Sequence, residues 1–327
     1  MFLKSNLPTL IRIFSYSILA ITFIFLINNI LTVWFDWPGV KILFSNYGLF
    51  GFKKLAKPLV DSQLLFSFLQ LIFYLISILF VVIYVLRSIN QTLKTDAEIL
   101  TKFTAYFIRS SFWAVLIVGL ADLLISFMVV EKLVEPIFGE TLKIKLVIPS
   151  FRITFVHFPL ILISFVIGYF TKSVGFIWLG VLVVGSEFAI VITRFIFEYE
   201  QAFQGDLVRF WYSALYLFAS AYALMHEGHV RVDVLYTGFS KRKKAWTNSM
   251  GSLLLGIPLC LIVLFLGMGN KASIINGPVI SFEVTQQGSN GLYLLYLMAV
   301  YLAVFAVSML TQFTSYFMSS SYQLLKN

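Results

Sequence analysis

Eight long apolar stretches constrain this chain more than any other feature of its sequence. A helix needs about 20 apolar residues to cross a membrane, because each residue rises ~1.5 Å and the hydrocarbon is ~30 Å thick. Stretches near this length occur at residues 13–35, 64–86, 104–130, 155–170, 175–197, 207–225, 251–268 and 292–318. The sequence therefore predicts an all-α fold, a polytopic helical membrane protein with about eight spans.

The composition excludes several other classes of protein. Hydrophobic residues make up 60% of the 327 residues and charged residues only 12%, whereas soluble domains are nearer 45–50% and ~25%. A soluble multidomain protein and a disordered chain are both excluded. Cys260 is the only cysteine, so no disulfide scaffold is possible. The basic residues lie at membrane edges with no aromatic platform between them, and no nucleic-acid partner is expected.

The segment 155–170 is the shortest of the eight and contains His157 and Pro159. It is predicted to span, but it could instead lie flat in the membrane interface. The choice decides on which side of the membrane the N-terminus lies.

The basic cluster KRKK, formed by Lys241, Arg242, Lys243 and Lys244, indicates the orientation. Short cytoplasmic loops carry an excess of Lys and Arg, and the loops on the opposite side of the flanking spans are acidic or nearly neutral. The KRKK loop and the C-terminus are therefore predicted to be cytoplasmic, and with eight spans so is the N-terminus. The lysines between residues 41 and 57 argue against this assignment. The four KRKK cations are expected to meet lipid headgroups.

Asp122 and Glu187 are carboxylates inside predicted spans. A charge at mid-bilayer costs ~2.5–3.5 kcal/mol, so each needs a partner, water or a proton. They could form an ion pathway, or they could face another helix and fix its register. The structural interpretation is favoured, because a pathway usually has more polar groups and more interrupted helices.

The sequence offers no catalytic constellation. His226 and His229 form an H-x-x-H pair, one residue shorter than the H-E-x-x-H spacing of zinc hydrolases. No P-loop and no G-x-S-x-G turn occurs. We therefore expect no catalytic residue, no metal ligand and no cofactor, and the chain is not predicted to be an enzyme.

The most specific stretch is AYALMHEGHVRVDVLYTGFSKRKKAW, residues 221–246. HVRVDVLY, followed by a short basic turn and AW before the next span, closely resembles the small membrane subunit of tripartite ATP-independent periplasmic (TRAP) transporters, the DctQ-type family. The resemblance covers roughly residues 165–320. It includes ITRFIF at 192–197 and GLYLLYLMAVYLAVFAV at 291–307. The residues that carry it are His229, Arg231, Asp233, Tyr236, Arg194 and Asp206, the last where the family usually has Glu.

The resemblance implies a function and partners. Such subunits scaffold a large DctM-type permease subunit, a sodium-coupled elevator, and a periplasmic DctP-type protein delivers an organic-acid-like solute. The chain would then lie in the bacterial inner (cytoplasmic) membrane as a multi-pass protein among membrane lipids. The alternative is a self-sufficient secondary transporter or channel that uses Asp122 and Glu187.

Residues 156–327 are expected to form the four-helix DctQ-like domain, and residues 1–155 a membrane extension of unknown role. We expect the extension to pack against the last four spans or the partner, with Asp122 facing protein; alternatively, it only enlarges the membrane footprint. The motif charges are expected to orient helices. Small residues of spans five and six are expected to allow close approach of the large subunit: Gly180, Gly185, Ala189, Ala214, Ala219 and Ala221.

Overall fold

The computed structural model describes residues 2–172, 176–226, 236–284 and 291–326. Over these residues the regular structure consists of helices and two π turns, with no strand. The elements are α1 (Phe2–Trp34), α2 (Val40–Tyr47), α3 (Asp61–Arg87), α4 (Leu93–Val130), α5 (Val134–Phe138), α6 (Glu140–Leu146), α7 (Pro149–Arg152), η1 (Ile153–His157), α8 (Phe158–Phe170), α9 (Phe176–Ile196), α10 (Ala202–Met225), α11 (Lys241–Gly251), η2 (Ser252–Gly256), α12 (Ile257–Gly267), α13 (Asn276–Ile280) and α14 (Leu295–Lys326).

Within these described ranges, seven helical segments are long and apolar enough to cross a membrane. The prediction of an all-α polytopic membrane protein is therefore confirmed. The doubtful fourth segment is one of the seven, because α7, η1 and α8 run on as a single stretch, Pro149–Phe170, of 22 residues. α8 packs along α4, so this segment lies against the helix bundle.

The predicted span at 207–225 corresponds to α10, which has 24 residues but is not among those seven segments. Its tyrosines, serines and Arg209 lower its hydropathy. α10 packs against α4, α9 and α14, so much of its surface faces protein. A helix in the interior of a membrane protein does not need the uniformly apolar surface that lipid requires, which explains why α10 is the least apolar of the eight.

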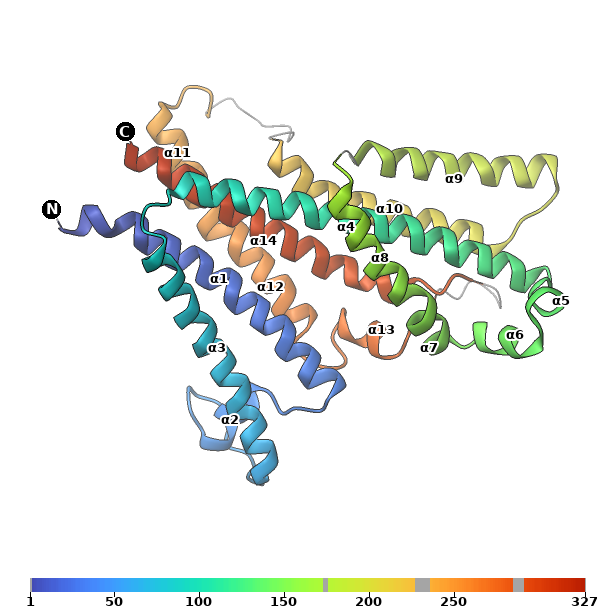
Figure 1. The fold of residues 1–327 in the computed structure, drawn as a ribbon, viewed down its shortest axis with the longest axis horizontal. Helices are drawn as coiled ribbons and strands as arrows, with labels where there is room; N and C mark the ends of the chain where they lie inside the picture. The colour runs from blue at the N-terminus through green and yellow to red at the C-terminus, as the bar shows by residue number, and fades with distance from the viewer. Residues whose placement is uncertain (1, 173–175, 227–235, 285–290, 327) are drawn as a thin grey trace.

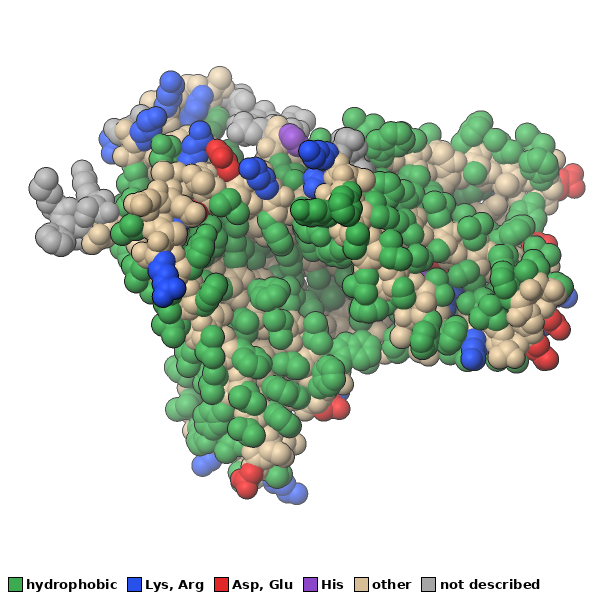
Figure 2. Space-filling model, viewed as in Figure 1, with side chains coloured by type: hydrophobic (Ala, Val, Ile, Leu, Met, Phe, Trp, Pro, Cys, Tyr) green, Lys and Arg blue, Asp and Glu red, His purple; other side chains and the backbone are tan. Residues whose placement is uncertain are grey.

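α4 and α14 form the centre of the molecule, and α10 lies beside both (Figure 1). α9 packs on α10 at one edge, while α1 and α3 form a hairpin that leads away from the bundle and carries α2 at its tip. The two ends of the chain lie at the same end of the molecule. Figure 2 shows a largely apolar surface along the helices, with Lys and Arg gathered around α11.

Both π turns come directly before a proline. Phe158 donates its backbone N–H to the Ile153 carbonyl, and Ile257 donates to Ser252, in each case five residues back. Pro159 and Pro258 follow at the next position. Proline has no N–H and its ring crowds the carbonyl four residues earlier, so an α-helix cannot continue undisturbed there. The π turns absorb this disturbance and turn the preceding residues onto a different face.

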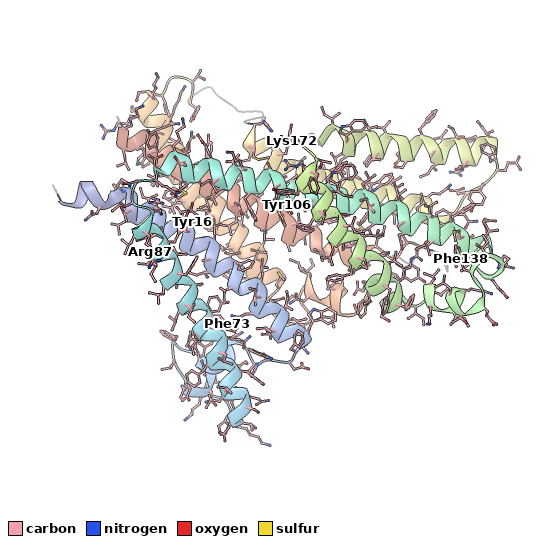
Figure 3. All side chains as sticks on the ribbon, viewed as in Figure 1. Tyr16, Phe73, Arg87, Tyr106, Phe138 and Lys172 are labelled. Atoms are coloured by element: carbon pink, nitrogen blue, oxygen red, sulfur yellow. The ribbon has the colours of Figure 1, made fainter. Side chains whose placement is uncertain are left out.

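α8 crosses α4 at a close contact made by Gly168. A Cβ atom added at Gly168 would lie 2.9 Å from the Cα atom of Ser110. Beside this contact, α4 side chains bond the last turn of α8. The hydroxyl of Tyr106, labelled in Figure 3, donates to the Phe165 carbonyl at 3.1 Å. Arg109 donates to the Gly168 carbonyl at 3.2 Å. A cation at a helix C-terminus is favourable, and this gives Arg109 a structural role.

Gly168→Ala is expected to destabilise the α4–α8 crossing by about 1–3 kcal/mol, because overpacking forces the backbones apart. Gly180→Ala is the matched control, since no atom lies within 4 Å of a Cβ built there. Thermal unfolding of the two purified variants in one detergent measures the difference. Equal midpoints for both would show that α8 has room to move.

Candidate functional site: a buried ionic cluster

Asp122 lies at the centre of a buried cluster between α4, the α7–η1 segment and the chain that enters α14. Its side chain is fully buried. Arg152 Nε lies 2.5 Å from Oδ1, and His157 Nε2 lies 2.9 Å from the same oxygen. The backbone N–H of Tyr293 donates to Oδ2 at 2.7 Å. Both carboxylate oxygens are therefore bonded to protein.

Arg152 is 1% exposed, and its guanidinium reaches beyond the carboxylate. Nη2 donates to the Asp122 carbonyl at 2.6 Å and to the Ser126 hydroxyl at 2.7 Å. The guanidinium carbon lies 4.3 Å from the centre of the Tyr293 ring, a cation–π contact. A buried charge is tolerated when it is paired and hydrogen-bonded, and Arg152 meets both conditions.

His157 completes the cluster from η1. Its Nδ1 lies 3.0 Å from the Tyr296 hydroxyl, and its ring stacks on the Tyr296 ring. Both ring nitrogens of His157 therefore have a hydrogen-bond partner, Asp122 for Nε2 and Tyr296 for Nδ1. The Asp122 and Arg152 charges offset each other, and the His157 ring connects the carboxylate to Tyr296.

A second buried carboxylate, Asp206 of α10, holds the neighbouring residue of the same chain segment. Its Oδ2 accepts the backbone N–H of Leu292 at 3.2 Å, while Asp122 accepts that of Tyr293. The Tyr293 hydroxyl donates to the Val147 carbonyl at 2.9 Å, and burial raises the pKa of that hydroxyl. Two carboxylates thus fix the approach to α14, where the helix dipole favours negative charge.

The π turn brings Arg152 and His157 to the same carboxylate. The two residues are five apart in sequence, and in an α-helix of 3.6 residues per turn they would point to different faces. A π turn closes over five residues, so η1 aligns them toward Asp122. Sequence reasoning identified Asp122 and His157 but missed Arg152 and Tyr296, because an α-helical period does not unite them. The signal that could have found Arg152 is Pro159, because a proline disturbs the helical turn that precedes it, between Arg152 and His157.

A second ionic cluster ties α1 to α3 and α4. Arg12 was interpreted as a basic residue at a membrane edge, but it is only 2% exposed. Its Nε lies 2.5 Å from the buried carboxylate of Asp96. Nη1 donates to the Ser88 carbonyl at 2.8 Å, and Nη2 to the Ser88 hydroxyl at 2.9 Å. Arg12 therefore connects three helices and is not free to meet lipid headgroups.

Glu187 and Arg194 lie apart from the cluster, on α9. Glu187 is exposed on the outer side of the helix, with no ion pair to any described residue. Arg194 pairs with Glu200 at 3.3 Å, and both side chains are more than half exposed. Asp122 is fully buried and Glu187 is exposed, so the two carboxylates lie in different surroundings.

Tyr199, after α9, connects that helix to the end of α4. Its hydroxyl donates to Glu131 at 2.8 Å. Partial burial and the neighbouring Glu131 carboxylate raise the pKa of Tyr199 to about 12, so the hydroxyl keeps its proton at neutral pH. This contact closes one end of an apolar groove of about 910 Å³ between α4, α9 and α10.

The motif residues His229, Arg231 and Asp233 lie outside the described residues. Tyr236 is described: its hydroxyl bonds the Asn248 side chain at about 3 Å. The Lys244 ammonium lies 5.2 Å from the centre of the Tyr236 ring. The end of the HVRVDVLY motif is thus attached to α11, the helix that carries the KRKK cations.

The cluster can connect and orient helices, since its charges are neutralised by each other and by backbone groups. Four parts of the chain meet there: α4, α7–η1, α10 through Asp206, and the segment before α14. The expectation that Asp122 faces protein agrees with its burial. The predicted boundary between residues 155 and 156 falls inside η1, and the division into two domains remains a prediction.

Comparison with known proteins identifies the C-terminal part of the chain. Residues 183–318 match the family model "Tripartite ATP-independent periplasmic transporters, DctQ component". The match begins inside α9 and runs through α10, α11, α12 and most of α14. No curated protein and no solved structure matches the chain. Residues 183–318 are thus the DctQ-like part of the chain, and additional apolar helices lie on the N-terminal side of this match.

Proposed function

We propose that this subunit is the static scaffold of a sodium-coupled transporter in the bacterial inner membrane. A large DctM-type subunit carries the sodium and solute sites, and a periplasmic DctP-type protein delivers an organic-acid-like solute. DctQ is a family of transporter components, not of enzymes. The observation that carries the proposal is the complete pairing of Asp122 with Arg152, His157 and the Tyr293 N–H. A carboxylate that binds a moving ion needs free oxygen ligands, and Asp122 has none.

The orientation belongs to the proposal. Seven apolar segments and α10 give eight crossings of the described chain, which fits with both termini lying at one end of the molecule. The KRKK cations lie at that same end (Figure 2). By the excess of Lys and Arg in short cytoplasmic loops, this end faces the cytoplasm. The tip that carries α2 and the α5–α6 end then face the periplasm.

The exposed side of α9 is the proposed contact surface for the large subunit. Among the described helices, α10 is the one against which α9 packs extensively. Gly185 and Ala189 of α9 remain exposed. Small residues allow another helix to approach closely. Glu187 lies two residues from Gly185 and from Ala189, so it points to another exposed side of α9, where its carboxylate needs a partner from outside the chain. Ala214 and Ala221 were also expected to face the partner, but they are fully buried inside this subunit.

Affinity isolation from the native membrane tests the assembly. The tagged chain is expected to bring down a large permease subunit, and Gly185→Leu is expected to lower its recovery by about tenfold, since a clash of ~1.4 kcal/mol at the contact suffices. Gly251→Leu is the matched control, because a Cβ built at either glycine meets no atom within 4 Å. A chain isolated alone and fully stable would contradict the proposal.

Reconstitution separates the scaffold from the self-sufficient transporter. The chain alone in liposomes under a sodium gradient is expected to move no solute, whereas the chain with its large subunit and binding protein does. Sodium-driven uptake by the chain alone, abolished by Glu187→Gln, would favour the transporter instead.

A further inference from the structure

A groove of about 680 Å³ lies where α11 begins and α14 ends. Its walls combine cations, aromatic rings and aliphatic groups. They are formed by Phe239, Arg242, Lys243, Trp246, Thr247 and Leu324. The basic side chains around α11 gather at this end of the molecule (Figure 2). The groove therefore lies at the boundary between the apolar surface and the charged end.

The four cations of the KRKK cluster do not have equivalent positions. Arg242 and Lys243 line the groove, and neither forms an ion pair with a described residue. Lys244 instead lies over the Tyr236 ring. Lys241 is exposed and does not line the groove. Two of the four cations thus converge on one cavity, which a generally basic surface would not require.

The first turn of α11 does not explain the groove by itself. The Ser240 hydroxyl already accepts the backbone N–H of Lys243, which caps the helix. The recognition groups are therefore the side chains. A guanidinium can bind a phosphate through two parallel hydrogen bonds, and an ammonium adds a point charge. Two such groups beside each other match one phosphate anion.

The apolar part of the groove favours a lipid as the source of that phosphate. Trp246 is 59% exposed, and tryptophan is enriched at the level of the lipid headgroups. Phe239 and Leu324 offer apolar surface next to the cations. A phosphate attached to a glycerol backbone and acyl chains satisfies both halves of the groove, whereas a free phosphate satisfies only the cationic half.

We propose that this groove binds the headgroup phosphate of an anionic phospholipid. Arg242 and Lys243 contact the phosphate, and Trp246, Phe239 and Leu324 contact the glycerol backbone and the first part of the acyl chains. The leaflet follows from the orientation proposed above, but the binding itself does not depend on that orientation or on the large subunit.

Lipid retention on the purified full-length chain tests the site. The chain in mild detergent is mixed with equal amounts of phosphatidylglycerol and phosphatidylcholine, and native mass spectrometry counts the lipids that remain bound. The wild-type chain is expected to retain phosphatidylglycerol selectively. Arg242→Gln and Lys243→Gln are each expected to reduce that retention by about fivefold, the effect of one basic residue near an anionic lipid.

Lys241→Gln is the matched control, because it removes the same charge from the same helix outside the groove. It is expected to change retention by less than Arg242→Gln does. Equal losses from Lys241→Gln and Arg242→Gln would overturn the site and leave only general surface attraction. Equal retention of the two lipids by the wild-type chain would also overturn it. So would a loss of large-subunit recovery with unchanged lipid retention, which would identify the groove as a protein contact.

Discussion

Asp122→Ala is expected to lower the free energy of unfolding by about 3–5 kcal/mol, because it leaves the buried Arg152 without its counter-charge. The same change removes the acceptor of the Tyr293 N–H and of His157. Chemical or thermal unfolding of the purified chain in detergent measures the loss. The approach to α14 should loosen as well, and proteolysis near residues 291–294 is expected to become faster.

Asp36→Asn is the control for this substitution, because asparagine also tolerates the left-handed backbone that Asp36 adopts (φ 56°). Asp36 also pairs with a cation, Lys271, but its side chain is 81% exposed and that of Lys271 is 53% exposed. Exposed ion pairs contribute little to stability, so no measurable change is expected. A second variant, Asp122→Leu combined with Arg152→Met, removes both charges and is expected to recover a large part of the lost stability. If Asp122→Ala unfolds like the wild-type chain, the cluster does not hold the helices together.

Removing the N-terminal helices is expected to have an effect that depends on whether α4 is kept. A chain that begins at residue 91 loses α1–α3 but keeps α4, which packs on α10 and α14. It should still fold and assemble. A chain that begins at residue 171 also loses α4 and α8, and its yield of folded protein is expected to fall at least tenfold. A tenfold fall in yield corresponds to a loss of only ~1.4 kcal/mol in the free energy of folding. α4 carries many of the buried residues, so its removal is expected to cost at least this much.

Size-exclusion profiles of the two truncated chains, and their recovery of the large subunit, provide the comparison. The chain that begins at residue 91 is the control, because it also loses membrane helices but keeps α4. If both truncated chains assemble and transport at the wild-type rate, the N-terminal helices only enlarge the membrane footprint. If assembly fails while solute affinity in the remaining complexes is unchanged, α4 and α8 belong to the scaffold.

The apolar stretches predicted the class of fold because the bilayer sets a fixed length for each span. They did not predict that α10 is an interior helix, because hydropathy does not distinguish a lipid-facing surface from a protein-facing one. The fourth segment looked short because its first turn, Pro149–Arg152, holds an arginine. In the structure that arginine is buried against Asp122, so the charge that seemed to end the span is part of it.

The candidate site was only partly predictable for a related reason. An intramembrane carboxylate such as Asp122 signals that a partner exists, but not which one. Arg152 is 30 residues away, and the Tyr293 N–H is 171 residues away in the sequence. Backbone donors have no sequence signature at all. The family motif was the strongest signal for function, yet of the residues that carry the resemblance only Asp206 belongs to the cluster.

The order of the cluster residues along the chain also bears on how the protein enters the membrane. Asp122 meets Arg152 and His157 within 35 residues, so these three are synthesised almost together, before the first residue of the DctQ match has been made. α4 and α8 can therefore enter the bilayer as one hairpin whose opposite charges are already neutralised, which avoids the ~2.5–3.5 kcal/mol that a lone aspartate costs at insertion. Tyr293 and Tyr296 are added last, and the Tyr293 N–H and the Tyr296 hydroxyl then close a site that the growing chain has prepared.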